Sequence, residues 1–183
     1  MSETIAAFHA VRFTLLFTES EDRLFLLAFD ANGAQVGLML TRRLTARLIN
    51  GLANLLERSN VAASTAPEEL KSDIVLMEHQ GALAETKTLA SSSGSQQQTN
   101  TLAGTGSTKV TQRLVTTVNI KTNPKDFHIV LQAPDGVPVA TAMNRFDLHR
   151  FVELLKRQAE TAGWNLQIDA AWLDDDHSQF TVN

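Results

Sequence analysis

The sequence is internally repetitive, and this repetition limits the possible folds more than any other feature does. Two stretches share one layout: the first runs from Arg12 to about Arg58 and the second from Val115 to about Arg157. They are displaced by 103 positions, which aligns Gly33 with Gly136. Further aligned pairs are Val36 with Val139, Leu40 with Met143, Thr41 with Asn144, Arg42 with Arg145, Arg47 with Arg150 and Leu52 with Leu155. Residue character matches more often than identity, so the pattern predicts a common architecture and identifies no activity.

Each stretch is predicted to form three antiparallel strands followed by a helix. In the first stretch, side chains from Val11 to Phe17 alternate as in a strand with one buried face. A second strand is expected at 24–29, then an Asn-Gly hairpin turn and a third strand at 35–40. Thr41 is the expected N-cap of a helix running to about Arg58. The apolar stripe of this helix is Leu44, Leu48, Leu52 and Leu55.

The second stretch repeats this order with weaker periodicity. Its strands are expected around 118–120, 127–131 and 137–143, with a turn at Pro134-Asp135-Gly136. Asn144 is the expected N-cap of the following helix. Its apolar stripe is Leu148, Phe151, Val152, Leu155 and Ala159.

The two halves differ after their helices. The first continues into a helix at 67–83 with Leu70, Ile74 and Met77 on one stripe. The second continues through Trp164 to Trp172 in strict alternation, which predicts a C-terminal strand. A turn at 174–177 and a short returning strand at 179–182 are expected after it.

These patterns favour an α+β fold made of tandem βββα repeats packed as a pseudo-twofold pair, with an extra central helix and a C-terminal strand or hairpin. The alternative is one continuous sheet with all helices on one side. The expected divisions are a first unit at 1–60, a connecting helix at 61–89, a flexible low-complexity linker at 90–109 and a second unit at 110–183. Units of about 50 residues bury little surface alone, so we expect them to pack on each other or on another copy.

Composition excludes some classes of function. The 183-residue chain has a net charge of −4, which gives no general attraction to nucleic acid or to an anionic membrane. Cysteine is absent, so thiolate catalysis and cysteine-ligated zinc sites are excluded. The sequence has neither a basic-apolar leader nor an apolar run of about 20 residues, so no membrane association is expected and a cytoplasmic location is predicted. No cofactor or metal requirement is predicted.

The second strand of the first half carries a surplus of apolar side chains. Leu24, Leu26 and Ala28 are its expected core face, whereas Phe25, Leu27 and Phe29 stand where the other half has His128, Val130 and Gln132. Either the helix at 67–83 or the C-terminal strand covers this second face, or it is a protein interface. Trp164 and Trp172 share a face of the predicted last strand and are either core residues or further interface residues.

Arginines recur in the first two turns of the repeated helices, where the helix dipole disfavours cations. They are Arg42, Arg43 and Arg47 in the first half and Arg145 and Arg150 in the second. They could hold an anion such as a nucleic-acid phosphate at the helix start. Ordinary ion pairs with neighbouring Glu and Asp, or solvated side chains, are the simpler interpretation.

No motif of a known catalytic class is present. The histidines are scattered, and Asp174-Asp175-Asp176-His177 is more typical of a solvated turn than of a cation site. A catalytic arrangement of Glu78, His79, His128 or His149 in space stays open.

The leading hypothesis is therefore a non-enzymatic interaction or assembly protein, such as an adaptor, scaffold or structural subunit, with a protein partner or self-association. A nucleic-acid-associated module that uses the five arginines is the alternative. A small enzyme with an unrecognised site is the third hypothesis.

Overall fold

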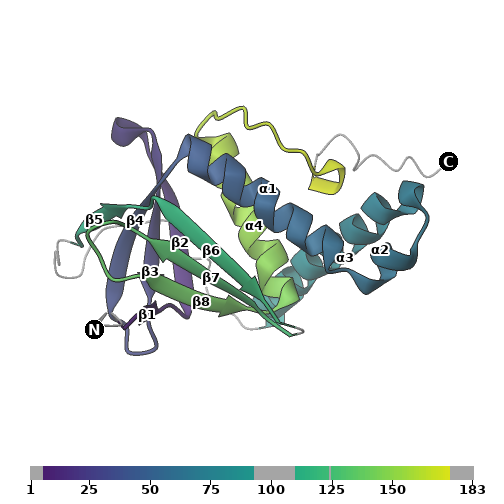
Figure 1. Cartoon of the computed structure of the whole chain (residues 1–183), viewed down its shortest axis with the longest axis horizontal. Coiled ribbons are helices and arrows are strands. Elements are labelled where there is room, and N and C mark those ends of the chain that lie inside the picture. The colour runs from purple at the N-terminus through teal and green to yellow at the C-terminus, as the bar shows by residue number, and fades with distance from the viewer. Residues whose placement is uncertain (1–5, 93–109, 124, 174–183) are drawn as a thin grey trace, which may run out of the picture.

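The computed structural model describes residues 6–92, 110–123 and 125–173, which form a mixed α+β fold with two four-stranded sheets (Figure 1). The first part of the chain contains β1 (Phe8–His9), β2 (Arg12–Thr18), a 3-10 turn (Glu19–Glu21), β3 (Arg23–Phe29), β4 (Gln35–Thr41), α1 (Arg42–Arg58), α2 (Val61–Thr65) and α3 (Glu68–Ser92). The second contains β5 (Gln112–Leu114), β6 (Thr117–Thr122), β7 (Phe127–Gln132), β8 (Val139–Met143), α4 (Arg145–Thr161) and a final 3-10 turn, η2 (Ala171–Leu173). The α+β prediction is confirmed, and each part contains an antiparallel three-strand meander.

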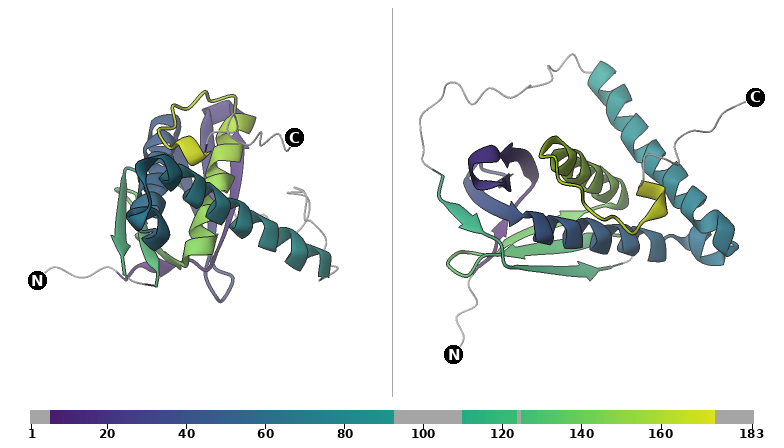
Figure 2. Two further views of the ribbon diagram at one scale, coloured as in Figure 1. Left: turned by 90° about the vertical axis from the view of Figure 1, so that its right-hand side faces the viewer. Right: turned by 90° about the horizontal axis from the view of Figure 1, so that it is seen from above.

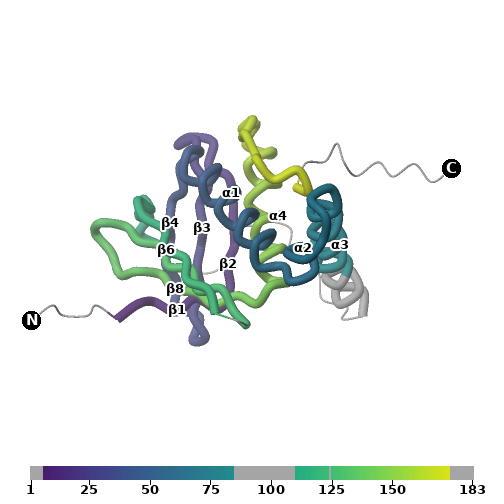
Figure 3. The backbone as a smooth tube through the Cα atoms, turned by 45° about the vertical axis from the view of Figure 1, so that its right-hand side comes forward, coloured from purple at the N-terminus to yellow at the C-terminus, as the bar shows by residue number. Residues whose placement is uncertain are grey.

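The two sheets exchange their outermost strands. One sheet has the order β2-β3-β4-β5 and the other has the order β1-β8-β7-β6. Strand β1 precedes β2 in the chain but pairs in parallel with β8, and the two lie side by side in Figure 3. Strand β5 precedes β6 but pairs in parallel with β4. Each meander is therefore completed by a strand from the other half of the chain. The alternative of one continuous sheet is wrong.

The registers of the two exchanged strands are related by the displacement seen in the sequence. His9 is opposite Ala140, and Gln112 is opposite Gly37. Gln112 lies 103 positions after His9, and Ala140 lies 103 positions after Gly37, so the displacement relates one pair to the other. The β3–β4 and β7–β8 hairpins also correspond, since Leu24 is opposite Leu40 and Phe127, 103 positions after Leu24, is opposite Met143.

Both 17-residue helices begin where their N-caps were predicted. The Thr41 hydroxyl accepts from the Leu44 N–H at 3.2 Å, and the Asn144 side-chain oxygen accepts from the Asp147 N–H at 2.9 Å. These bonds satisfy amide groups that the first helical turn leaves without partners.

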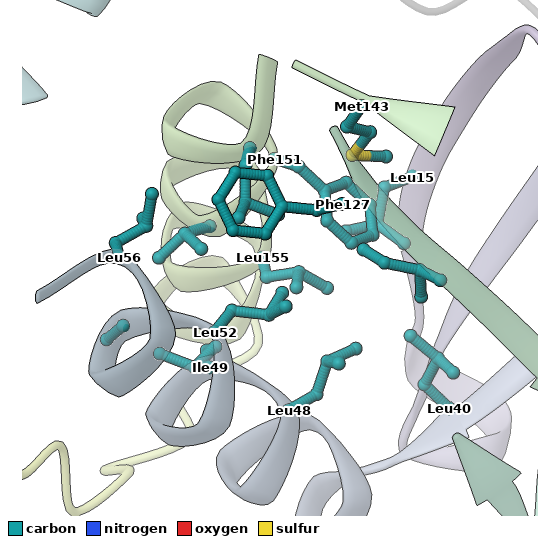
Figure 4. Packing of buried hydrophobic residues seen from close by; sticks show 14 of the residues in the cluster. Leu15, Leu40, Leu48, Ile49, Leu52, Leu56, Phe127, Met143, Phe151 and Leu155 are labelled. Atoms are coloured by element: carbon teal, nitrogen blue, oxygen red, sulfur yellow. The ribbon is translucent and has the colours of Figure 1, made fainter. Parts of the chain in front are cut away.

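The core lies between the paired helices α1 and α4 and the inner faces of both sheets. In Figure 4, leucines and Ile49 of α1 meet Phe151 and Leu155 of α4, together with Leu15, Leu40, Phe127 and Met143 from the strands. All five residues predicted for the α4 stripe are buried. Because side chains of both halves form one cluster, neither half encloses a core by itself.

Helix α4 ends in a Schellman motif that fixes the direction of the following chain. Gly163 has a positive φ of 66°, and its N–H donates to the Glu160 carbonyl at 2.9 Å. The Trp164 N–H donates to the Ala159 carbonyl, also at 2.9 Å. This turn directs the Trp164 side chain back to Phe17, whose ring centroid is 5.9 Å away in an edge-on contact.

The predicted C-terminal strand is wrong. Residues 165–170 have no regular secondary structure, and η2 comes directly after them. The alternation of apolar side chains arises because this segment runs along the helices: Asn50 of α1 donates to the Gln167 carbonyl and accepts from the Asp169 N–H. The predicted turn at 174–177 and the returning strand at 179–182 lie outside the described residues.

The stripe of Leu70, Ile74 and Met77 named for the central helix is not the buried face of α3. Among the α3 side chains that the structure describes, Val75, Leu76, His79 and Ala82 are buried. Leu70 and Met77 point away from the core. The views in Figure 2 show the end of α3 extending past the other helices. Helix α3 continues to Ser92, into the predicted linker, and the rest of that linker lies outside the described residues.

Candidate functional site

The outer face of the β2–β5 sheet is apolar, as the sequence predicted. Leu24, Leu26 and Ala28 of β3 are fully buried on the inner face, whereas Phe25, Leu27 and Phe29 are half-buried and lie outside the core cluster. Helix α3 packs against α1, α4 and η2, so it does not cover them. Residues 165–173, the described part of the C-terminal segment, run along the helices and do not cover them either.

Contacts within the sheet itself partly cover the apolar side chains of this outer face. The ring of Phe25 lies over Gly37, where an added Cβ would be 2.8 Å from its Cε2 atom. The Arg12 guanidinium stacks on the Phe29 ring at 4.1 Å from the ring centroid. The face is thus a half-covered apolar surface with the Arg12 guanidinium at its border.

Helix α3 exposes a second apolar surface. Leu70 is 50% exposed and Met77 is 73% exposed. They are seven positions apart and therefore share one face of the helix, whereas Ile74 between them is half-buried and packs against the core cluster. A side chain added at Gly81, the next position of this spacing, would meet nothing within 4 Å. Val61 of α2 is also strongly exposed.

The two tryptophans are core residues of this single chain. Trp164 is 5% exposed and Trp172 is 2% exposed. The ring of Trp172 packs edge-on against His79 and His149, with centroid distances of 5.2 and 5.6 Å. The sequence left open whether they are core residues or interface residues, and both lie in the core cluster.

The predicted arginine set is divided between two environments. Arg145 and Arg150 have intramolecular partners: Arg150 donates to the Ala82 carbonyl at 3.0 Å and pairs with Asp147. Arg42 donates to the Asn165 carbonyl at 3.3 Å. Arg43 and Arg47 are exposed and form no ion pair with another described residue. The structure does not bring all five guanidinium groups together.

The Arg145 guanidinium forms a network of hydrogen bonds. It donates from Nε and Nη2 to the two carboxylate oxygens of Glu78, with 2.8 Å between Nη2 and Oε2. Further bonds go from Nη1 to Ser59 Oγ at 2.6 Å and from Nη2 to the Leu56 carbonyl at 2.5 Å. Asn60 Nδ2 also donates to Glu78 Oε2, at 2.8 Å. Arg145 thereby joins the start of α4 to α3 and to the end of α1.

Two histidines lie beside this ion pair. Nδ1 of His79 in α3 is 3.2 Å from Nδ1 of His149 in α4. His149 is fully buried, and 5% of His79 is exposed. His149 Nε2 is 3.3 Å from Glu78 Oε2 but forms no hydrogen bond in the described part of the chain, and His79 Nε2 is 3.5 Å from Glu153 Oε2. We call Glu78, His79, His149, Glu153 and Trp172 the histidine cluster.

Burial and charge set the protonation of this cluster. Burial, with the nearby charge of Arg145, lowers the pKa of His149 to about 4 although Glu78 opposes this shift. Burial would raise the pKa of Glu78, but the hydrogen bond and the charge of Arg145 outweigh it and lower that pKa. The contact with His79 lowers the pKa of Glu153 despite burial. At neutral pH, His149 is therefore neutral and both carboxylates are charged.

The sequence named Glu78, His79 and His149 as residues that could meet in space, and they do meet. His128, the fourth residue of that set, lies apart and contacts Asn123. Three of the best-formed cavities in the described part of the chain are lined by other residues than Glu78, His79 and His149. That part of the chain also contains no group of three or more potential metal ligands. The cluster thus has the residue types of an acid–base site but lies outside these three cavities.

Within the described residues, no helix has the length and apolar character needed to cross a bilayer. Comparisons with protein-family models, with curated proteins and with solved structures find no match for this chain.

Proposed function

We propose that this protein is a non-enzymatic interaction or assembly protein that binds a protein partner or a second copy. The single observation that carries the proposal is the outward apolar surface of α3, formed by the exposed Leu70 and Met77. Helix α3 already has a buried face that packs on α4, so its apolar residues occupy two faces. Solvent-exposed apolar side chains at helical spacing are typical of a helix that binds a partner.

The outer sheet face with Phe25, Leu27 and Phe29 supports the same proposal as a second contact surface. Its residues are only half-buried, and part of their cover comes from the neighbouring strands. Trp164 and Trp172 no longer belong to the proposed surface, because both are buried within the chain.

Affinity purification of the tagged chain from its native cells, with and without nuclease, tests this function. A stoichiometric protein that survives nuclease, or a discrete oligomer on sizing, is the expected result. The double variant Leu70→Ser with Met77→Ser should lose the partner. The matched control is Val137→Ser with Phe146→Ser, which removes exposed apolar side chains elsewhere and should keep it. A monomer that captures no protein would refute the proposal.

A nucleic-acid-associated module is a second candidate, supported by Arg43 and Arg47. Both lie in the first two turns of α1, a helix with no acidic residue in its first turn. Arg47 also lines a cavity of about 230 Å³ between α1 and β6. Recovery of the complex only without nuclease, and its loss in Arg43→Glu with Arg47→Glu, would favour this candidate over the first.

We further propose that the chain consists of two linked βββα repeats. The displacement of 103 positions relates the bounds of α1 and α4, the β3–β4 and β7–β8 registers and the two exchanged strands. The β2–β3 and β6–β7 pairings do not share a register, since Arg12 is opposite Phe29 but Thr117 is opposite Gln132. The two halves have diverged at this edge.

A further inference from the structure

The contact between His79 and His149 depends on the protonation of the two Nδ1 atoms. A neutral imidazole carries one N–H, so two facing Nδ1 atoms form a hydrogen bond only when one is a donor and the other an acceptor. The separation of 3.2 Å fits one such bond, with a single proton between the two nitrogens. One added proton gives the pair a single positive charge and can enter at an Nε2 atom, so that this bond is kept. Only when both rings are imidazolium do two N–H groups and two positive charges face each other in a buried site.

The surrounding groups do not offset a second charge. From α3, Glu78 faces His149, but its oxygens already accept from Arg145 and Asn60. From α4 come two cations, Arg145 and Lys156, and one carboxylate, Glu153, which is 3.5 Å from His79. The α1–α2 junction contributes the neutral Asn60, and the described part of the C-terminal segment contributes the Trp172 ring.

We propose that the His79–His149 pair is a pH-sensitive latch between α3 and α4, closed while one proton is shared by the two Nδ1 atoms and opened when both rings become imidazolium. Opening separates α3 and Trp172 from α4 and exposes the apolar side chains that now face α4, among them Val75, Leu76 and Leu173. The depressed pKa of His149 agrees with a closed latch at neutral pH. This inference does not depend on the proposed partner, because it concerns a contact within the chain.

The two tryptophans allow a local opening to be distinguished from unfolding. Trp172 touches both histidines, whereas Trp164 lies at the other end of α4 with Phe17. A Trp164→Phe variant retains Trp172 as the reporter, and Trp172→Phe retains Trp164. On acidification from pH 7 toward pH 4, Trp172 emission should shift to the red while Trp164 emission and helical circular dichroism stay constant. Simultaneous change of both tryptophans, or no change at Trp172, would overturn the latch.

Histidine variants test the mechanism of the transition. In the Trp164→Phe background, His79→Gln and His149→Gln remove the group that accepts the second proton and should each move the transition by more than one pH unit. His128→Gln is the control, since this exposed histidine lies on β7 beside Asn123 and outside the histidine cluster, and it should leave the midpoint in place. An unmoved midpoint in both cluster variants would contradict the proposal.

Two measurements on the wild-type chain cover the case in which these variants do not fold. Proton NMR should show the His149 ring neutral down to the pH of opening and then protonated together with the change at Trp172. Protonation of His149 without any change at Trp172 would contradict the latch. The second measurement is zinc binding, which should be weak or absent. Stoichiometric zinc binding that preserves the contact would contradict the latch, since a metal and not a proton would then join the two rings.

Discussion

The indole N–H of Trp164 donates a hydrogen bond of 2.6 Å to the Asp22 carboxylate, across a separation of 142 positions in the chain. Asp22 has a left-handed backbone with φ of 48° at the turn before β3, and Trp164 comes directly after the left-handed Gly163 at the end of α4. This hydrogen bond thus links two tight turns that lie far apart in the sequence.

Breaking this bond should destabilise the fold without loss of the aromatic packing. Trp164→Phe keeps a ring beside Phe17 but removes the donor to a charged acceptor, which should cost about 1.5–3 kcal/mol in free energy of unfolding. Asp22→Gly keeps the left-handed backbone and removes the acceptor. Urea unfolding of the two single variants and the double variant checks the coupling. Strictly additive effects would show that the bond contributes nothing.

The same substitution should have opposite effects at two glycines. Gly163→Ala forces a side chain into a φ of 66° and should destabilise the chain by about 1 kcal/mol. Gly51 is an exposed interior position of α1 where an added Cβ meets nothing. Gly51→Ala should therefore stabilise by about 0.5–1 kcal/mol. Thermal unfolding of both variants provides the comparison, and a shift of equal sign would contradict this assignment of the two glycines.

Removal of the Arg145 side chain should weaken the attachment of α3. Arg145→Ala leaves the Glu78 carboxylate, 22% exposed, with only Asn60 as a hydrogen-bond donor, and we expect a loss of about 2–4 kcal/mol in unfolding free energy. Hydrogen exchange should increase in α3 more than in the sheets. Arg47→Ala, which removes an exposed arginine with no ion pair to a described residue, is the control and should be within about 0.5 kcal/mol of wild type.

Stability should fall on acidification in two stages. His149 has a folded-state pKa of about 4, below its ordinary 6.5, so the unfolded chain gains a proton first as the pH falls through this range. The loss should reach up to about 3 kcal/mol by pH 4. The pKa values of Glu78 and Glu153 are lowered from 4.5, so the stability that they contribute above 4.5 is lost at lower pH.

Urea unfolding at a series of pH values measures this dependence. His149→Gln should flatten the upper stage and leave the lower one. A wild-type stability that is constant between pH 6.5 and pH 5 would contradict the assignment of a neutral, buried His149.

Cleavage between the two halves should not separate them. A protease site inserted into 93–109 of the full chain would give two fragments joined by the exchanged strands β1 and β5 and by the common core. After cleavage, the fragments should co-elute on sizing and separate only in denaturant. Two independently eluting fragments would show that the exchange does not hold the halves together.

Local signals in the sequence were sufficient for most of the fold. The caps at Thr41 and Asn144 and the stripe of α4 result from helix chemistry within a few residues. The exchange of β1 and β5 could not be predicted in this way, because two and three residues of strand carry too little pattern. These two strands pair with the edge strands of the two meanders, β8 and β4, and such edges form only when the chain folds.

The errors at 164–172 and in α3 have a common cause: contacts between distant parts of the chain decide where an apolar side chain packs. Alternating apolar residues at 164–172 predicted a strand, but Asn50 and the Gly163 turn hold this segment along the helices. In α3 the apolar residues occupy two faces, and periodicity alone could not say which face meets α4. The meeting of His79 with His149 was named from residue type, but its geometry depends on how α3 crosses α4.

The exchange of outer strands has a consequence for biosynthesis. As the ribosome delivers the chain, β1 emerges first, yet its partner β8 begins only at Val139. The β2–β4 meander likewise waits for β5 at Gln112–Leu114 to cover its edge. An exposed strand edge is a template for association with other chains. The early half of a nascent chain therefore carries an open edge through much of translation, and two neighbouring nascent chains on one messenger could complete each other's sheets before either is released.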